Sequence, residues 1–242
     1  MDETTRDPGR TLSRREASDA VSELGWRYIL GLVRASVPVG SLVQAGAVAA
    51  RALAAAGPDA DEHLWMDVRR DRVVLTLQSL ASANVTTRDI ELAHRISAAV
   101  SELGLRTDAD IGEGAPRSVQ VLEIAIDALD IASVRPFWKA VMGYGDEAGA
   151  SGPEDPLIDP VGQCPAIWFQ QMSAPRPQRN RIHFDVSVPH DEAQRRIHAA
   201  LDAGGVVVSD ARAPAFWVLA DPEANDPERP STRSITSLVN AA

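Results

Sequence analysis

The chain has 242 residues, and its composition argues against several classes of protein. Hydrophobic residues make up 45% and charged residues 24%, which is typical of a soluble globular protein with one large domain or two of ordinary size. The net charge of −10 disfavours nucleic-acid binding, and neither a membrane span nor a signal peptide is recognisable. A single cysteine, Cys164, excludes an internal disulfide. We therefore expect a cytoplasmic protein.

The first residues predict a tail followed by two helices. Residues 1–12 are polar, which is typical of a flexible tail. Ser13 and Glu16 have the spacing of a capping box, and the helix that they open is expected to end at Gly25. An alanine-rich segment over about 41–56, closed by a Gly-Pro pair, predicts the second helix.

A hairpin and a third helix are predicted next. Apolar residues alternate with other side chains over 64–69 and again over 73–78, which predicts two paired strands. Thr86 and Asp89 form another capping-box pattern, which opens a helix that runs to Gly104. The predicted order in the first half is helix, helix, strand, strand, helix.

A change of composition divides the chain. Residues 106–118 contain two glycines, a proline and several charges, which is typical of a linker. We therefore expect one domain over 13–105 and a second over 119–242.

The second half contains a weak internal repeat. A predicted strand over 121–127 leads into a helix that ends at Gly143, and a predicted strand over 181–188 leads into a helix over about 191–203. Short strand candidates follow each helix, at 165–172 in the first copy and at 206–209 and 216–220 in the second. The repeated unit is βαβββ, so the predicted fold class is α+β throughout. Superposing the copies places Glu123 opposite His183.

This second half, residues 118–240, resembles a glyoxalase-like domain of the vicinal oxygen chelate superfamily. The resemblance is carried by the strand with Asp127, by Pro136-Phe137-Trp138 and Met142-Gly143-Tyr144, by Asn180 to Asp185, and by Asp221-Pro222-Glu223-Ala224-Asn225. It implies paired βαβββ sheets curled around a cup, small-molecule chemistry of the lyase or isomerase type, and a divalent ion such as Zn, Mn, Ni or Fe.

The resemblance also implies candidate site residues. Glu123 and His183 occupy the two first-strand ligand positions, where they would act as metal ligands or as a catalytic base and its orienting partner. Glu228 is a third candidate ligand, although the flanking prolines favour a loop at this point. Gln170 or Gln171 would help to place the substrate, but strand alternation turns only one of them inward. Trp138, Trp168 and Trp217 are candidates for the lining of the cup or for the core.

Two alternatives remain open for this half. A hydrogen-bonded pair of Glu123 and His183 accounts for both residues without a metal. The protein would then bind or sequester a small molecule without catalysis, as drug-resistance members of the same superfamily do. The expected partners are a small-molecule ligand and a second copy of the chain, with neither nucleic acid nor membrane.

The first half, residues 15–105, resembles pterin-4a-carbinolamine dehydratase, through Gly25-Trp26, the strand with Trp65, Val73 to Thr76 and Val85 to Ala93. Aligned on Trp65, the three histidine positions of that enzyme fall on Asp61, Glu62 and Leu80, and its proline position falls on His63. All three catalytic histidines are therefore missing. Leu80 cannot transfer a proton, which favours packing, dimerisation or binding of a flat heterocycle over dehydration of 4a-hydroxytetrahydrobiopterin.

Overall fold

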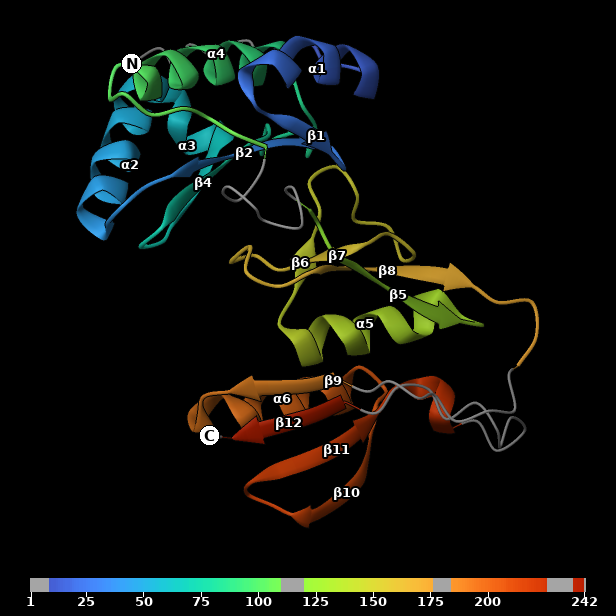
Figure 1. Ribbon diagram of the computed structural model, residues 1–242. Coiled ribbons are helices and arrows are strands. Elements are labelled where there is room, and N and C mark those ends of the chain that lie inside the picture. Colours follow the sequence, from blue (N-terminus) through green and yellow to red (C-terminus); the bar gives the residue numbers. More distant parts are fainter. Residues whose placement is uncertain (1–8, 110–119, 176–183, 226–236, 242) are drawn as a thin grey trace, which may run out of the picture. The chain divides into compact units, whose positions relative to one another are not determined.

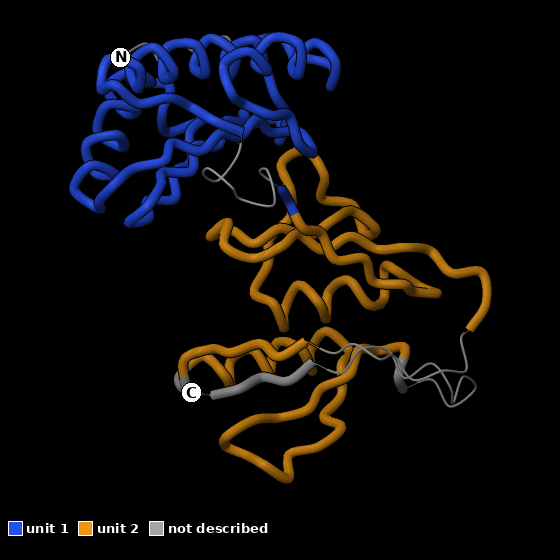
Figure 2. The backbone as a smooth tube through the Cα atoms, in the orientation of Figure 1, with its two compact units in different colours: residues 1–121 blue, residues 122–242 orange. Residues whose placement is uncertain are grey.

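A computed structural model of the protein describes residues 9–109, 120–175, 184–225 and 237–241 (Figure 1). The chain divides into two compact units, residues 1–121 (unit 1) and residues 122–242 (unit 2) (Figure 2). Both units combine helices with sheets, as the predicted α+β class requires. None of the described helices has the length and apolar character needed to cross a bilayer.

Unit 1 consists of one antiparallel sheet with helices on one face. Its elements are α1 (Arg14–Val21), η1 (Ser22–Leu24), β1 (Arg27–Ile29), β2 (Leu32–Pro38), α2 (Leu42–Ala56), η2 (Gly57–Asp59), α3 (Ala60–His63), β3 (Leu64–Val68), β4 (Arg72–Leu77) and α4 (Thr87–Ser101). The strand order is β1-β2-β4-β3. Alternate residues of β2 and β4, such as Val33, Val37 and Leu75, join Trp26 and the inner faces of the helices in one buried core.

Local signals account for the helix ends of unit 1. The Ser13 side chain accepts a hydrogen bond from the Glu16 N–H, and the Glu16 carboxylate accepts from the Ser13 N–H, so the predicted capping box is confirmed. Thr86 and Asp89 form the same reciprocal cap on α4. The predicted helix over 41–56 and the predicted hairpin are confirmed as α2 and as β3 with β4.

Two strands of unit 1 are absent from the predicted element order. β1 and β2 form a hairpin around Leu30 and Gly31, which both have positive φ, at 44° and 78°. Turns of this kind favour Asn-Gly or Asp-Gly, and a leucine in the first position gives no turn signal. The predicted order therefore lacked half of the sheet.

The predicted boundaries of the first domain are too narrow. The Leu12 N–H donates to the Val85 carbonyl, so the end of the expected tail is fixed, while residues 1–8 lie outside the described part. At the other end, the Thr107 hydroxyl donates to the Leu24 carbonyl, and Ser36 and Asp108 exchange two backbone hydrogen bonds of 2.7 Å. Residues 107–109 thus belong to unit 1, and residues 110–118 of the predicted linker lie outside the described residues.

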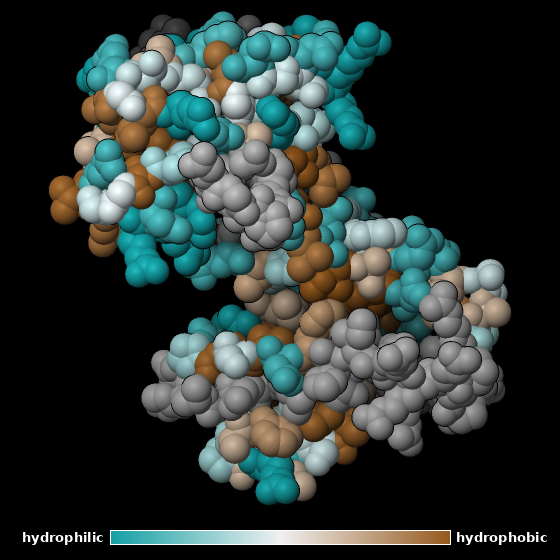
Figure 3. Space-filling model, in the orientation of Figure 1, coloured by the Kyte–Doolittle hydropathy of each residue, from teal (hydrophilic) through white to brown (hydrophobic). Residues whose placement is uncertain are grey.

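α2 has an apolar outer side. Its residues Leu42, Val43 and Leu53 are exposed, and hydrophobic side chains lie over this helix in the space-filling view (Figure 3). The inward-facing residues of the same helix are alanines and a valine that pack in the core. α2 is therefore apolar around most of its circumference, unlike the amphipathic α4.

Unit 2 contains the predicted repeat. The first copy comprises β5 (Glu123–Ala128), α5 (Ile131–Met142), β6 (Gly145–Asp146), β7 (Leu157–Ile158) and β8 (Ala166–Gln171); the second comprises β9 (Phe184–Val188), α6 (His190–Asp202), β10 (Val206–Arg212), β11 (Phe216–Ala220), η3 (Pro222–Asn225) and β12 (Ser237–Ala241). The sheets have the orders β5-β8-β7-β6 and β10-β11-β12-β9. In each copy the first strand pairs in parallel with the fourth, so the βαβββ repeat is confirmed.

The two copies share one core, which lies between their sheets. α5 packs on α6, and Figure 1 shows β5 and β8 on one side of α5 with β9 and β12 on the other. Contact is close: a Cβ on Gly205 would lie 2.3 Å from the Phe137 ring. The Arg196 guanidinium also donates to the Val141 and Met142 carbonyls at the C-terminal end of α5. The helix-covered faces of the two sheets are thereby directed toward each other.

Candidate functional site

No helix of the described part of unit 2 covers the outer face of its first sheet. Ile126 and Ile167 are buried on the helix-covered face, so strand alternation places Glu123, Ala125 and Asp127 of β5 on the outer face. The parallel register sets these three residues beside Ala166, Trp168 and Gln170 of β8. We refer to these six residues as the β5–β8 face.

An exposed aromatic side chain lies in the middle of the β5–β8 face. Trp168 is 36% exposed, and its register partner, Ala125, is too small to cover it. Gln170 shares this face, whereas Gln171 donates to the Leu129 carbonyl at 2.8 Å. The sequence did not show which of the two glutamines faces the ligand. The structure places Gln170 on this face, so a ligand bound there would contact Gln170.

A second carboxylate, which sequence reasoning missed, lies near Glu123. Burial raises the pKa of Glu147, and the charges of Glu123 and Asp155 add to this effect. Glu147 and Ala150 form a β-bridge just after β6, far from Glu123 along the sequence. No local sequence motif predicts that Glu147 lies near Glu123, because the two residues come together only when the sheet forms.

Trp138 and Trp217 do not belong to this face. Trp138 is fully buried, packs edge-to-face against Phe137 and Phe184, and donates to the Asp221 carboxylate at 3.3 Å. Trp217 packs against the same core from β11. Of the two alternatives that the sequence left open, cup lining and core, Trp138 and Trp217 therefore belong to the core, and Trp138 also links the two copies through Phe184 and Asp221.

The candidate metal ligands are not assembled within the described part of one chain. His183 and Glu228 lie outside the described residues, and no group of three His, Cys, Asp or Glu side chains suited to a metal occurs within them. Glu123 is exposed at the start of β5, while β9, the strand that follows His183, belongs to the other sheet. The packing of α5 on α6 between the sheets keeps the two outer faces apart.

The Asp-Pro-Glu-Ala-Asn segment has a structural role in this arrangement. Glu223 is buried, and its Oε1 accepts hydrogen bonds from the Leu129 and Asp130 N–H groups, at 2.6 and 2.7 Å. These donors lie at the start of α5, where backbone N–H groups lack partners within the helix. The segment therefore fastens the second copy to the first.

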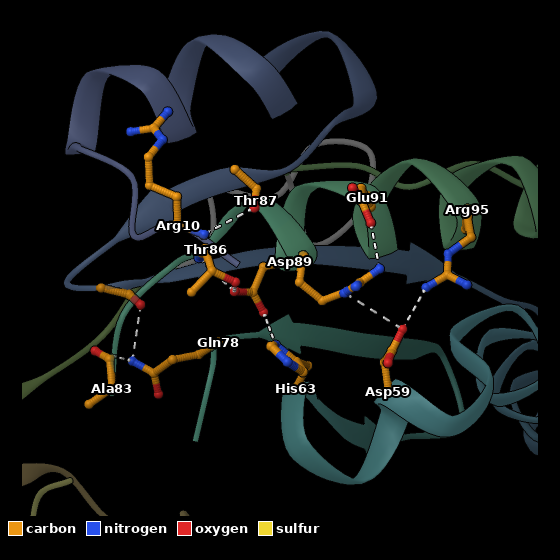
Figure 4. Close-up of polar contacts among 12 residues, drawn as sticks. Arg10, Asp59, His63, Gln78, Ala83, Thr86, Thr87, Asp89, Glu91 and Arg95 are labelled. Carbon is orange, nitrogen blue, oxygen red and sulfur yellow. Dashed lines mark hydrogen bonds and ion pairs between the residues drawn. The ribbon is translucent and has the colours of Figure 1, made fainter. Parts of the chain in front are cut away.

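In unit 1 the positions matching the pterin dehydratase histidines lie close together at the surface, since the Leu80 N–H donates to the Glu62 carbonyl at 3.0 Å. Asp61 and Glu62 are exposed on α3, and Leu80 is 47% exposed beyond β4. His63 is instead buried, with its Nδ1 at 2.8 Å from Asp89 Oδ1, and Figure 4 shows its ring directed at that carboxylate. The other oxygen of Asp89 accepts from the Thr86 N–H and hydroxyl.

This arrangement gives His63 a structural function. Asp89 is fully buried and closes the capping box of α4, so the His63–Asp89 contact joins the end of α3 to the start of α4. A buried carboxylate needs such partners, since an unpaired charge in the interior is costly. Among the described residues at these positions the one imidazole is that of His63, which is already hydrogen-bonded to Asp89. The enzyme that unit 1 resembles uses three histidines.

Comparison with known proteins agrees with this division of the chain. Residues 123–227 match a family described as a glyoxalase-like domain. No curated protein matches the chain. The N-terminal part is similar to a transcriptional coactivator/pterin dehydratase from Brucella melitensis, with 25% identity and a TM-score of 0.34 over 37% of this chain and 98% of that one.

Solved glyoxalase-like structures are also similar to this chain. A glyoxalase/bleomycin resistance protein/dioxygenase family enzyme from Burkholderia phytofirmans has 15% identity and a TM-score of 0.33, over 49% of this chain and 95% of its own. The fosfomycin resistance protein FosX from Listeria monocytogenes has 11% identity and a TM-score of 0.34, over 51% and 91%. The family match thus assigns a glyoxalase-like domain to residues 123–227, within unit 2.

Proposed function

We propose that unit 2 binds a small molecule on the β5–β8 face and acts on it through the carboxylates there. The exposure of Trp168 at the centre of this face carries the proposal. An exposed indole flanked by a small residue supplies a flat apolar surface for a ring or chain of the ligand. Two residues along the strands from Trp168, in opposite directions, Gln170 of β8 and Glu123 of β5 supply polar groups that fix its orientation.

The carboxylates define the chemistry of the ligand. Glu123 accepts hydrogen bonds or binds positive charge, so the ligand presents an amine, another donor or a bound cation at this end. Glu147 has its pKa raised by burial and then by the Glu123 charge, a perturbation of the kind found at carboxyl groups that transfer protons. Proton transfer by such a pair supports lyase or isomerase-type chemistry. Binding without turnover is the alternative.

A divalent cation is a second candidate for the positive group. Metal binding at Glu123 requires further ligands, for which His183 and Glu228 are the candidates from the sequence. FosX, which has the same fold, has been crystallised with Mn(II). Because the described residues contain no set of three suitable ligands, we assign no catalytic step to a metal.

A second copy of the chain would complete the site. β5 and β9 are both outer strands of their sheets, and an outer strand exposes unpaired backbone groups. We propose that β5 of one copy adjoins β9 of another, which brings Glu123 of one copy near β9 of the other. Sedimentation velocity tests this step: a dimer is expected, and a monomer that binds ligand would contradict it.

The binding proposal is tested by a thermal-shift screen of small aromatic amines and neutral polar molecules against the full chain. Hits should lose at least tenfold in affinity in Trp168→Leu and in Glu123→Gln, measured by calorimetry. Trp65→Leu is the matched control, since Trp65 is also an exposed strand tryptophan but lies in unit 1. Hits that bind Trp168→Leu as well as they bind the unchanged protein would refute the proposed site.

Metal dependence is decided by plasma mass spectrometry of the tag-free protein. Near-stoichiometric metal that is lost in the double variant Glu123→Ala, His183→Ala would support chelate-type chemistry. Protein that is free of metal and takes up no added Zn, Mn, Ni or Fe(II) would leave binding or metal-free proton transfer. Turnover of a 4a-hydroxytetrahydropterin, which we do not expect with Leu80 in place of a histidine, is measured in the same preparations.

A further inference from the structure

The helix-free face of the unit 1 sheet carries an unusual row of side chains. Val33, Leu75 and Tyr28 pack in the core, so their neighbours along each strand lie on the opposite face. The strand registers pair Arg27 with Arg34, Arg34 with Thr76, and Thr76 with Trp65. These four residues cross all four strands, and we call them the Arg–Trp row.

Arg34 has no acidic partner in this row. Its Nε donates to the Thr76 hydroxyl and its Nη1 to the Gln120 carbonyl, both at 3.0 Å. Among the described residues, no carboxylate lies within ion-pair distance of Arg34 or of Arg27, whose Nη1 donates to the Ser22 and Trp26 carbonyls. The nearest acidic side chain along β3, Asp67, is held by Arg69 at 3.0 Å.

Other partly buried arginines of the protein differ in this respect. Arg72 pairs with Asp71, Arg88 with Glu91 and Arg135 with Asp146. Arg196 has no acidic partner among the described residues, but it donates to carbonyls at the negative end of a helix. Arg34 contacts one hydroxyl and one isolated carbonyl, which leaves most of its charge uncompensated.

Burial makes this lack of compensation costly. Arg34 is half-buried, and desolvation lowers the pKa of its guanidinium. A cation removed from water without a counter-charge destabilises the folded state unless an anion joins it. An arginine in this position, with its planar donor group partly desolvated, is suited to bind a carboxylate or phosphate.

Trp65 defines the other end of the row. It is 40% exposed and lies two strands from Arg34, which corresponds to about 10 Å at the usual strand spacing. Thr76 lies between them and is only 8% exposed, so it forms the floor. From this geometry we infer that unit 1 binds a small planar anion, with its ring on Trp65 and its carboxylate or phosphate on Arg34.

The net charge of the protein and the small number of arginines in the row favour a small planar anion over a nucleic acid as the ligand. The chain has a net charge of −10, and the row offers two arginines within a single line across the sheet. Nucleic-acid binding relies on many phosphate contacts over an extended basic surface. One aromatic ring and one acidic group match the two ends of the row.

The probes are 2-naphthoate and 2-naphthyl phosphate, with 2-naphthamide as the uncharged counterpart, titrated calorimetrically into the full chain. Both acids should bind at least tenfold more tightly than the amide. Arg34→Gln should remove this preference, and Trp65→Leu should weaken both acids at least fivefold. Two variants serve as controls and should leave both affinities within twofold. They are Arg72→Gln, which lies on the same face but pairs with Asp71, and Trp168→Leu, which lies in unit 2.

Several outcomes would overturn the inference. These are failure of both acids to bind, equal binding of the amide, unchanged binding by Arg34→Gln, or loss of binding in Trp168→Leu. A change of oligomeric state in Arg34→Gln without any effect on the probes would assign the row to a contact between copies. If Arg34→Gln does not fold, Thr76→Val and Arg27→Gln are measured in its place. Each should weaken the affinity for each acid at least threefold.

Discussion

Unit 1 and unit 2 present the same kind of surface with opposite charge. Each has a sheet with helices on one face and an exposed tryptophan on the other, Trp65 in unit 1 and Trp168 in unit 2. Beside Trp65 the register places Thr76 and then Arg34. Beside Trp168 it places Ala125, with Glu123 and Gln170 on the same face two residues away along the strands, in opposite directions. The sheet provides the exposed surface, and the side chains of alternate residues decide which ligand it suits.

The units also differ in how their cores are closed. In unit 1 the helices cover a single sheet, and the buried contact between His63 and Asp89 joins α3 to α4. In unit 2 the core lies between two copies of one motif, and it is held by Phe137 against Gly205 and by Glu223 at the start of α5. Substitutions in these contacts should therefore affect one unit and spare the other.

The largest effect is expected from Gly205→Ala. The new Cβ would lie 2.3 Å from Phe137 Cδ2 and 2.9 Å from the Ala200 carbonyl oxygen, so α5 and α6 must move apart. Such overpacking costs roughly 1–3 kcal/mol of the free energy of unfolding. Urea denaturation followed by the fluorescence of unit 2 tryptophans measures it. Gly46→Ala in α2, where a Cβ meets no atom within 4 Å, is the control and should be neutral or stabilising.

A similar loss, confined to unit 1, is expected from His63→Leu. The substitution leaves Asp89 Oδ1 buried without its hydrogen-bond partner, which costs about 1–3 kcal/mol. Chemical denaturation of the variant should show lower stability of unit 1 alone. His94→Leu, at an exposed position of α4, should remain within about 0.5 kcal/mol of the unchanged protein. Equal effects of the two substitutions would contradict the structural role of His63.

Glu223→Ala should destabilise unit 2 by about 1–2 kcal/mol. It removes the acceptor of the Leu129 and Asp130 N–H groups, and losses of helix caps have this magnitude. Hydrogen exchange at these two amides should become faster than in the unchanged protein. Glu154→Ala, on an exposed turn, serves as the control. Unchanged exchange in Glu223→Ala would show that the segment is not fastened to α5 in solution.

The smallest effect concerns the pH dependence of unit 2. Glu147 has a pKa above its ordinary value of 4.5, through burial and then through the charges of Glu123 and Asp155. The folded state therefore holds the proton more tightly than the unfolded state, and stability is lost as the pH rises from the unfolded pKa through the folded one. Glu147→Gln should stabilise unit 2 at pH 7 by up to about 0.5 kcal/mol. The gain should vanish near pH 4, and a gain independent of pH would contradict the assignment.

Local signals explain which parts of this protein were predictable. The caps at Ser13 and Thr86 follow from residues three positions apart, and the βαβββ repeat follows from similar spacing in both copies. The β1–β2 hairpin was missed because Leu30 carries no turn signal. The boundary at residue 105 failed because the Thr107 contact with Leu24 spans most of unit 1.

The candidate site was predictable only in part, for a related reason. Glu123 and Gln170 follow from strand positions, but the choice between Gln170 and Gln171 depends on which face the helix covers. Trp138 and Trp168 have the same side chain, and tertiary packing alone sends one to the core and the other to the surface. Glu147 joins Glu123 through folding of the sheet, which no spacing rule encodes.

The most direct test of the opposite charge of the two surfaces uses the five tryptophans as reporters. Nuclear magnetic resonance of the ¹⁵N-labelled full chain, with indole signals assigned by substitution, would be recorded with 2-naphthoate and with 2-naphthylmethylamine. The amine should shift the Trp168 signal and the acid the Trp65 signal, while the buried Trp26 and Trp138 stay unchanged. Shifts of the same tryptophan by both probes, or of neither surface tryptophan, would contradict the account.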